Sequence, residues 1–234
     1  MALYALIIAG GRGERLRPLT NDRPKAMVPV AGKPLLAHQF DWLRQGGVTH
    51  AVILCHYMAH VIQEHFGDGA GTGLRISYSI EEEPLGRGGA LRRGYETFVP
   101  PDEETIVALN GDIITRQPLE QLLQHHKRKR AAATVMLVPL RSPYGIAKTD
   151  RAGHITSFLE KPVLPHWINA GVYVLSREFF RRLPAKGDHE DTTFPELAAE
   201  GKLFAYKRRA YWRPVNSIKD LNEAERELAG VTPA

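Results

Sequence analysis

The residues best suited to chemistry lie in one long loop near the start of the chain. Glycines at positions 10, 11 and 13 let backbone N–H groups approach a phosphate, because no Cβ stands in the way. Five cations follow between positions 12 and 25, namely Arg12, Arg15, Arg17, Arg23 and Lys25. Two carboxylates, Glu14 and Asp22, oppose them. This excess of cations beside glycines is suited to a polyphosphate.

Two common phosphate-binding motifs do not fit this loop. A dinucleotide-binding fingerprint needs G-x-G-x-x-G leading straight into a helix, but Pro18 interrupts the stretch and the third glycine is missing. A Walker A loop needs Gly-Lys followed by Ser or Thr, whereas Gly32 and Lys33 are followed by Pro34. A plain surface loop of more than about 20 residues is uncommon in a compact domain, so we expect this one to bind a ligand.

A carboxylate further along the chain is a candidate metal ligand. Asp112 follows the apolar run 105–109 (TIVAL) as the last residue of Asn110-Gly111-Asp112. A carboxylate at the carboxyl end of a strand, after a glycine that lets a ligand approach, is suited to Mg²⁺. Taken alone, the same residue could belong to a turn.

Together these segments resemble the signature of sugar-1-phosphate nucleotidylyltransferases. Residues 10–34 read GGRGERLRPLTNDRPKAMVPVAGKP, against the family pattern G-G-x-G-x-R-L-x-P-L-T…P-K-x-M-x-P-V…K-P. Further matching segments are EEEPLGRGGAL (81–91), LNGD (109–112), FLEKP (158–162) and NAG (169–171). The resemblance covers nearly the whole chain. Within the family, the chain most resembles the short enzymes that guanylylate mannose 1-phosphate or heptose 1-phosphate.

The resemblance implies that a nucleoside triphosphate and a sugar 1-phosphate react, with Mg²⁺, to give a nucleotide sugar and pyrophosphate. The attacking phosphate is already anionic near neutral pH, so the site needs positioning and cations rather than a general base. By resemblance, Arg15 holds the triphosphate and leaving group, Lys25 draws the reacting phosphates together, and Asp112 binds the metal. The implied nucleotide-binding residues are Ala9, Gly10, Gly11, Gly13, Glu81, Pro84, Gly88 and Asn110.

The resemblance also assigns residues to the sugar phosphate. Glu160 is expected to accept hydrogen bonds from sugar hydroxyls, and Lys161 to meet the 1-phosphate. Asn169 is expected to bond the sugar, and Gly145 to offer its backbone. A neutral polyol with a phosphate tail requires this mixture of acceptor, donor and cation. Which sugar is bound cannot be derived from these residues, because the candidate sugars differ in single hydroxyl positions.

One segment departs from the family pattern at the second metal ligand. The family has a carboxylate within W-x-x-V-D-T-x-x-D or D-x-G-T-P-E-D, whereas residues 212–220 read WRPVNSIKD and place Asn216 there. An amide oxygen can still bind Mg²⁺ but brings no charge, so we expect weaker metal binding. Asp220 is an alternative ligand. The residues favour another role for it, in which Ser217 caps the last helix and Asp220 lies in its first turn.

The choice of nucleobase is predicted from Glu81, which by resemblance reads the edge of the base. A carboxylate only accepts hydrogen bonds. Guanine offers two adjacent donors, whereas uracil and thymine offer one donor flanked by carbonyls, so we expect GTP. Glu82 and Glu83 are expected to be solvated. Arg87 stands where the family usually has Thr, and the sequence alone gives no account of that change.

The elements that must position these residues alternate through the first half of the chain. Apolar strands are expected at 3–9, 49–55, 74–80 and 105–109, and helices at 34–46, 57–66 and 89–98. Later we expect strands near 133–140 and 171–175 and a helix at 217–228. The order predicts a mostly parallel sheet with helices on both faces. The resemblance implies a Rossmann-like, three-layer α/β/α domain spanning 1–234, with nucleotide bound by about 1–112 and sugar phosphate by about 113–234.

Composition excludes several other classes of protein. The chain has 234 residues, 43% hydrophobic and 24% charged, which excludes a disordered chain. No apolar run approaches the roughly 20 residues of a membrane span, and residues 1–11 lack the basic region of a signal peptide. The single cysteine, Cys55, fits a reducing cytoplasm. The basic run HHKRKR (125–130) is expected to be the exposed end of a helix, because no nucleic-acid motif accompanies it.

Two alternatives to a guanylyltransferase stay open. Asn216 and Arg87 favour a non-catalytic subunit that senses nucleotide sugars, although a decayed site would have little reason to keep Arg15, Lys25 and Asp112 together. An enzyme that uses UTP, CTP or dTTP on another phosphorylated small molecule would have the same mechanism. Family members frequently self-associate, so the resemblance is compatible with a homo-oligomer, although these residues do not determine the oligomeric state.

Overall fold

The computed structural model describes residues 2–230, which are arranged around a seven-stranded sheet. From one edge to the other its strands are β12 (Leu203–Lys207), β8 (Ala133–Arg141), β11 (Val163–Ser176), β6 (Thr105–Asn110), β1 (Tyr4–Ile8), β4 (His50–Cys55) and β5 (Arg75–Ile80). Strands β6, β1, β4 and β5 run parallel, and β8 is parallel to β12. Because β11 is antiparallel to both of its neighbours, the sheet is mixed but mostly parallel, as predicted.

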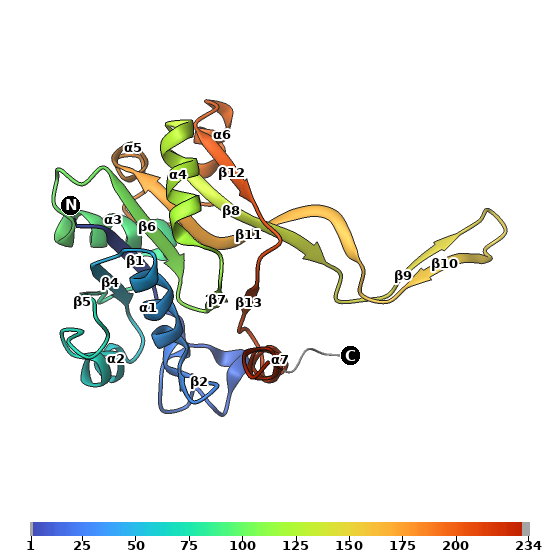
Figure 1. Ribbon diagram of the computed structural model, residues 1–234, viewed down its shortest axis with the longest axis horizontal. Helices are drawn as coiled ribbons and strands as arrows, with labels where there is room; N and C mark the ends of the chain where they lie inside the picture. The colour runs from blue at the N-terminus through green and yellow to red at the C-terminus, as the bar shows by residue number, and fades with distance from the viewer. Residues whose placement is uncertain (1, 231–234) are drawn as a thin grey trace.

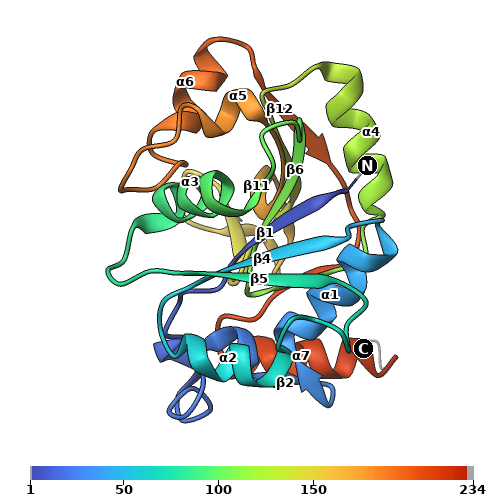
Figure 2. The ribbon, with the colours of Figure 1, turned by 90° about the vertical axis from the view of Figure 1, so that its left-hand side faces the viewer.

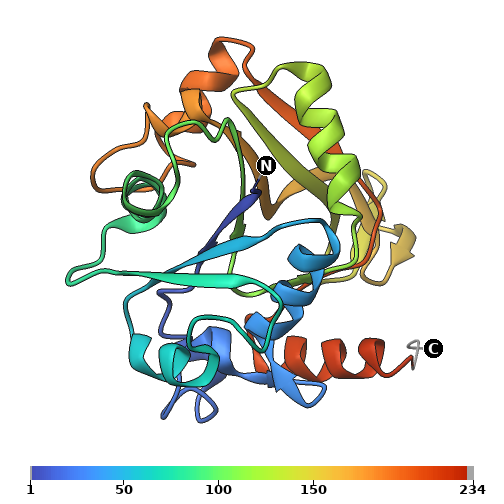
Figure 3. The ribbon, with the colours of Figure 1, turned by 60° about the vertical axis from the view of Figure 1, so that its left-hand side comes forward.

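Helices cover both faces of this sheet. On one face lie α1 (Leu35–Gln45), α2 (Ala59–Phe66) and α4 (Leu119–Lys129), and on the other α3 (Gly86–Phe98), α5 (Arg177–Phe180) and α6 (Thr193–Ala199). Figures 2 and 3 show α3 and α4 on opposite sides of the strands. Successive residues of β1 serve the two faces, since Ile7 packs with Phe40 of α1 and Leu6 with Leu91 of α3. The three-layer arrangement is therefore confirmed.

The loop after β1 is more ordered than its Gly- and Pro-rich sequence indicates. It contains two 3₁₀ turns, Glu14–Leu16 and Lys25–Met27, and a short hairpin of β2 (Pro29–Val30) and β3 (Lys33–Pro34). Leu16 and Val28 are fully buried against Leu221 of the last helix, α7 (Ile218–Leu228). Figure 2 shows α7 lying beside β2. This small apolar cluster anchors the cationic loop in one position. A flexible surface loop would have no such buried anchor.

A second small sheet joins two distant parts of the chain. Strand β7 (Ile113–Thr115) pairs antiparallel with β13 (Trp212–Pro214), so that Pro214 lies opposite Ile113. One residue beyond this pair, the Val215 N–H donates to the Asp112 carbonyl at 2.8 Å. Asn216 is thereby brought beside Asp112.

Strands β9 (Ile146–Thr149) and β10 (Ile155–Leu159) form an antiparallel hairpin that projects from the rest of the molecule (Figure 1). The sequence analysis did not predict this hairpin, nor α5, α6, β12 and β13. Two predicted boundaries were also wrong, because α3 begins at Gly86 and β11 at Val163. The basic run at 125–130 does end α4, as predicted, and residues 127–130 are exposed, but His126 is buried against the sheet side of the helix, where it contacts Thr134. Among residues 2–230, no helix combines the length and apolar character needed to cross a membrane.

Candidate active site

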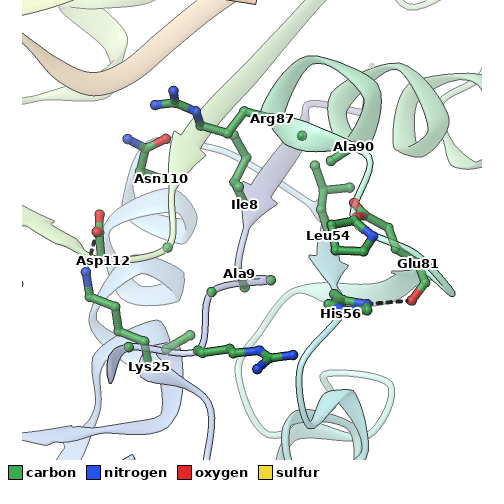
Figure 4. Close-up of a pocket in the computed structure, with 18 of the residues that line it drawn as sticks. Ile8, Ala9, Lys25, Leu54, His56, Glu81, Arg87, Ala90, Asn110 and Asp112 are labelled. Atoms are coloured by element: carbon green, nitrogen blue, oxygen red, sulfur yellow. Dashed lines mark hydrogen bonds and ion pairs between the residues drawn. The ribbon is translucent and has the colours of Figure 1, made fainter. Parts of the chain in front are cut away.

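A cavity of about 710 Å³ opens at the carboxyl ends of β1, β4 and β6, where α3 and the loop after β1 also meet (Figure 4). All but one of the predicted nucleotide-binding residues line it: Ala9, Gly10, Gly11, Gly13, Glu81, Pro84 and Asn110. The exception is Gly88, which faces a neighbouring loop. The three predicted catalytic residues, Arg15, Lys25 and Asp112, line the same cavity. Its size is typical of a small-ligand site.

Two glycines are needed because the backbone passes close to other atoms. Gly13 adopts a φ of 68°, and a Cβ there would lie 2.9 Å from the Lys25 Cβ. Gly111 brings its N–H to the Ile8 carbonyl at 2.8 Å, and a Cβ on it would lie 2.6 Å from that oxygen. Gly13 therefore allows the cationic loop to fold back on Lys25, and Gly111 allows the Asp112 turn to pack against the end of β1.

Lys25 lies at the centre of the polar cluster. Its ammonium donates to Asp112 Oδ2 at 2.5 Å and to Asn216 Oδ1 at 2.7 Å. Arg15 reaches the same Asn216 oxygen at 3.4 Å. The Lys25 side chain is only 15% exposed, so its charge acts in a partly desolvated site. The structure thus brings together the two predicted catalytic cations and both predicted metal-binding residues from three distant segments.

A buried glutamine fixes the turn that carries Asp112. The Gln39 amide of α1 donates to the Asn110 carbonyl at 2.8 Å and to the Ile113 carbonyl at 2.9 Å. Gln39 is 2% exposed. Because these two carbonyls flank Gly111 and Asp112, α1 positions the carboxylate without contacting it.

The donor set fits a magnesium ion that also binds phosphate. Asp112 and Asn216 present oxygens that converge on one point, since both contact the same ammonium nitrogen. No group of three or more His, Cys, Asp or Glu side chains in residues 2–230 is arranged to hold a metal. Mg²⁺ is usually held by one or two protein carboxylates, with phosphate oxygens and water completing its shell. Two protein oxygens are therefore sufficient, although they carry one negative charge rather than two.

Asp220 is part of a helix cap. The Ser217 hydroxyl accepts from the Asp220 N–H at 3.2 Å and donates to Asp220 Oδ2 at 2.9 Å. The same carboxylate oxygen accepts from the Asn216 N–H at 3.0 Å. Asp220 does not line the cavity, so the predicted capping arrangement is confirmed. The cap holds the backbone of Asn216 in position.

The opposite end of the cavity contains Glu81 and His56. The His56 ring nitrogen Nδ1 lies 2.9 Å from the Glu81 carbonyl, and Leu54 lies beside them (Figure 4). Glu81 Oε2 accepts from the Leu85 N–H at 3.0 Å, which fixes the carboxylate and leaves Oε1 without a hydrogen bond from the described residues. Sequence analysis did not identify His56, although it directly follows the predicted strand 49–55 and so lies at the same sheet edge.

Arg87 also lines the cavity, with Asp188 of the loop before α6. Its guanidinium donates to Asp188 Oδ2 at 2.9 Å and pairs with Glu190 Oε1 at 2.8 Å. The hydrogen bond from Arg87 lowers the pKa of Asp188, whereas burial raises the pKa of Glu190. The Gly88 N–H donates to the Gly187 carbonyl at 2.9 Å, so this glycine serves the contact between α3 and the loop.

The residues expected to bind the sugar phosphate do not line this cavity. Gly145, Glu160 and Lys161 lie together at the base of the β9–β10 hairpin, where a Cβ on Gly145 would be 2.9 Å from Glu160 Oε2. Glu160 and Lys161 side chains are 63% and 50% exposed. Asn169 lies apart from them on β11, where it donates to the Tyr173 hydroxyl at 2.8 Å. Their roles stay predictions from the resemblance.

This fold and cavity define a class of protein. A model of the nucleotidyl transferase family matches residues 4–230, and the chain belongs to that family. It is 36% identical to a mannose-1-phosphate guanylyltransferase of Mycobacterium tuberculosis, over 98% of this chain and 66% of that protein. It is 34% identical to the mannose-1-phosphate guanyltransferase beta-B of Xenopus laevis, over 93% of this chain and 62% of that protein. The chain thus spans less than two thirds of either relative.

Solved structures share the fold over almost the whole chain. The crystal structure of HddC from Yersinia pseudotuberculosis has a TM-score of 0.77 and 25% identity, over 97% of this chain and 99% of that one. The same protein complexed with GMP-PN gives a TM-score of 0.75. A UDP-glucose pyrophosphorylase complexed with UDP-glucose, at 18% identity and a TM-score of 0.76, has the same fold.

Proposed function

We propose that this protein transfers a nucleoside monophosphate from GTP to a sugar 1-phosphate of the mannose or heptose type, releasing pyrophosphate. The observation that carries this proposal is the convergence of Lys25, Asp112 and Asn216 beside the glycine loop, within one cavity that is large enough for a nucleotide. Relatives named for mannose-1-phosphate guanylyltransfer and a fold neighbour complexed with GMP-PN support the choice of guanine and sugar.

The residues of the chain divide the task of an in-line displacement at the α-phosphorus. Backbone N–H groups of the glycine loop contact the triphosphate, and Arg15 stabilises the departing pyrophosphate. Lys25 neutralises charge that builds on the phosphorus as the sugar-phosphate oxygen attacks. The Lys25 ammonium, which donates to Asp112 and Asn216, has a third N–H for a phosphate oxygen, and the two acceptor oxygens keep further lone pairs for a metal. No residue has to abstract a proton.

Magnesium is the proposed cofactor, with Asp112 and Asn216 as its protein ligands. When bound, the ion neutralises phosphate charge and orients the triphosphate. The chain contributes the fixed geometry, because Gln39 holds the Asp112 turn and the Val215 N–H binds the Asp112 carbonyl at 2.8 Å.

Glu81 is the proposed reader of the nucleobase. Its carboxylate is fixed by the Leu85 N–H, and both oxygens retain lone pairs for the adjacent N1–H and N2–H donors of guanine. A pyrimidine with one donor between two carbonyls would place oxygen lone pairs against this carboxylate. Pro84, His56 and Leu54 supply the adjoining surface for the base.

For the sugar phosphate we propose Gly145, Glu160, Lys161 and Asn169. We further propose that residues 1–234 act as one catalytic domain in the cytoplasm, where nucleoside triphosphates are made, and that copies of the chain associate. Cys55 supports a reducing compartment, because it is the single cysteine of the sequence and is a free thiol.

The test is pyrophosphate release from each of GTP, UTP, CTP and dTTP with mannose, heptose and glucose 1-phosphates in the presence of Mg²⁺. Release with GTP and a mannose- or heptose-type substrate is the expected result. Release with another nucleotide but not GTP would overturn the assignment of Glu81. Nucleotide-sugar binding without turnover would instead support a sensing subunit, the alternative that the uncharged Asn216 favours.

A further inference from the structure

Arg87 is held in one orientation by two carboxylates of the loop before α6. Its side chain meets Asp188 at 2.9 Å and Glu190 at 2.8 Å, and its own backbone N–H donates to Asp188 Oδ1 at 2.7 Å. Asp188 thus binds both the backbone and the guanidinium of the same residue. A guanidinium anchored in this way loses little further rotational freedom when it binds a ligand.

The loop that carries these carboxylates is packed tightly against the start of α3. Gly187 accepts from the Gly88 N–H at 2.9 Å and donates to the Leu85 carbonyl at 2.8 Å. A Cβ on Gly86 would lie 2.7 Å from the Gly187 carbonyl oxygen, and one on Gly89 would lie 2.6 Å from the Ala185 carbonyl oxygen. The glycines around Arg87 are therefore required by this contact, which sets the position of Asp188.

Behind the ion pairs lies an aromatic cluster that keeps the loop rigid. His189 is fully buried and packs edge-on against Tyr173, with ring centroids 5.4 Å apart, and against Phe194 at 4.8 Å. Glu190 is also largely buried, with 19% of its side chain exposed. Arg87 is consequently a fixed part of the cavity wall.

The guanidinium retains donors for a ligand. It has five N–H groups, of which one donates to Asp188 Oδ2, and it forms an ion pair with Glu190 at 2.8 Å. The Arg87 side chain is 43% exposed and lines the cavity. The flanking carboxylates offset its charge, so a neutral acceptor such as a hydroxyl is a better partner than a second phosphate.

Arg87 lies at the end of the cavity away from the proposed base site. Figure 4 shows its guanidinium on the side of Asn110, with Glu81 and His56 on the other side of Ile8 and Leu54. Asn110 in turn touches the segment of Asn169, because a Cβ on Gly171 would lie 2.5 Å from Asn110 Nδ2 and the Asn169 side chain accepts from the Gly171 N–H at 2.8 Å. Asn110, which lines the cavity together with Arg87, therefore adjoins the segment of the proposed sugar-binding residue Asn169.

We infer that Arg87, oriented by Asp188 and Glu190, is a specificity-determining residue that donates a hydrogen bond to a hydroxyl of the sugar and narrows the cavity against sugars with bulkier substituents. This inference rests on the proposed function, because it specifies the sugar end of the same site. The side chain of Thr, the residue usual at this position in the family, is too short to contact both Asp188 and Glu190.

The test compares Arg87→Thr and Arg87→Lys with Arg93→Thr, a matched control at an exposed arginine of the same helix. At saturating nucleotide, Arg87→Thr should lower kcat/KM for the best sugar 1-phosphate roughly 10- to 100-fold, the effect of losing a charged hydrogen bond. Its KM for the nucleotide should stay within about twofold of the wild-type value. The kcat/KM for an N-acetylhexosamine 1-phosphate should increase relative to the kcat/KM for the parent hexose 1-phosphate. Arg87→Lys should be intermediate, because lysine lacks the planar fork.

A binding measurement keeps the result independent of turnover and of folding. Calorimetric titrations should show that Arg87→Thr weakens the binding of GDP-mannose more than the binding of GDP. The midpoint of unfolding is recorded for every variant. Unchanged ratios of kcat/KM among the sugar 1-phosphates, or equal losses of affinity for GDP and GDP-mannose, would overturn the role of Arg87. A wild-type protein that releases no pyrophosphate would instead refute the proposed function, and the GDP-mannose to GDP affinity ratio would still decide the role of Arg87.

Discussion

The ammonium of Lys25 lies 2.5 Å from a carboxylate oxygen of Asp112, although 87 residues separate them. The same ammonium lies 2.7 Å from the Asn216 oxygen, 191 residues away. Three segments that are remote in sequence therefore meet at one cation in the wall of the cavity. The positive charge of this ammonium therefore offsets the negative charge of Asp112.

Replacing Lys25 or Arg15 by Ala should remove most of the activity. Each side chain supplies positive charge where charge develops during phosphoryl transfer, and loss of one such group typically costs about 100- to 1000-fold in kcat. Steady-state pyrophosphate release measures this loss. Arg17→Ala is the matched control, since Arg17 is an exposed arginine of the same loop outside the cavity lining. Full turnover by Lys25→Ala would remove the basis of the proposed mechanism.

Asn216→Asp should strengthen metal binding. A second carboxylate beside Asp112 adds a negative charge to the ligand pair, so half-saturation by Mg²⁺ should shift to a severalfold lower concentration. Titration of pyrophosphate release with Mg²⁺ measures the shift, and Mn²⁺ binding followed by electron paramagnetic resonance measures it without turnover. Asn222→Asp adds the same charge at an exposed position of α7 and should leave both titrations unchanged. Identical titrations for Asn216→Asp and the wild type would contradict the ligand assignment.

The sequence was informative about the nucleotide end of the site because there the signal is local. The strand before the loop, the glycines and the cations are close together in the chain, and they line one cavity in the structure. The buried parallel strands were equally evident from continuous apolar runs such as 105–109.

The features that were missed depend on contacts between distant segments. The orientation of the Arg87 side chain depends on its hydrogen bond to Asp188, 101 residues away, and nothing in the local sequence connects them. The β9–β10 hairpin has no buried face to produce an alternating pattern, since Ile155 is 63% and Phe158 62% exposed. Strand β13 is three residues long and is defined by its pairing with β7. Such elements are fixed by tertiary contacts rather than by periodicity.

The buried His189 should make the fold sensitive to acid. Burial lowers its pKa to about 4 from the ordinary 6.5, so between these values the unfolded chain binds the proton more readily than the folded one. The free energy of unfolding therefore decreases as pH falls from 6.5 toward 4, by on the order of 3 kcal/mol for this group. His126, whose pKa burial also lowers to about 4, adds a similar contribution.

The variant His189→Phe isolates this contribution. Phenylalanine fits among Tyr173, Phe179 and Phe194 and has no proton to bind, so the loss of stability between pH 6.5 and 4 should be smaller than in the wild type. Urea unfolding at several pH values measures the difference, with His60→Phe as the exposed control. Parallel pH dependences for His189→Phe and the wild type would show that the ring is not held neutral.

Glu81→Gln should weaken the preference for GTP. The amide keeps the size of the side chain but replaces one acceptor by a donor, which would face a donor of guanine instead of accepting from it. Since a hydrogen bond to a charged group contributes about 1.5–3 kcal/mol, the KM for GTP should rise roughly 10- to 100-fold while turnover with a saturating nucleotide changes little.

The neighbouring Glu82→Gln, at an exposed position, should have no such effect. Because Glu81 Oε2 also binds the Leu85 N–H, an unfolding midpoint for each variant separates loss of base recognition from loosening of the turn. Equal KM values for GTP in both variants would mean that another residue reads the base.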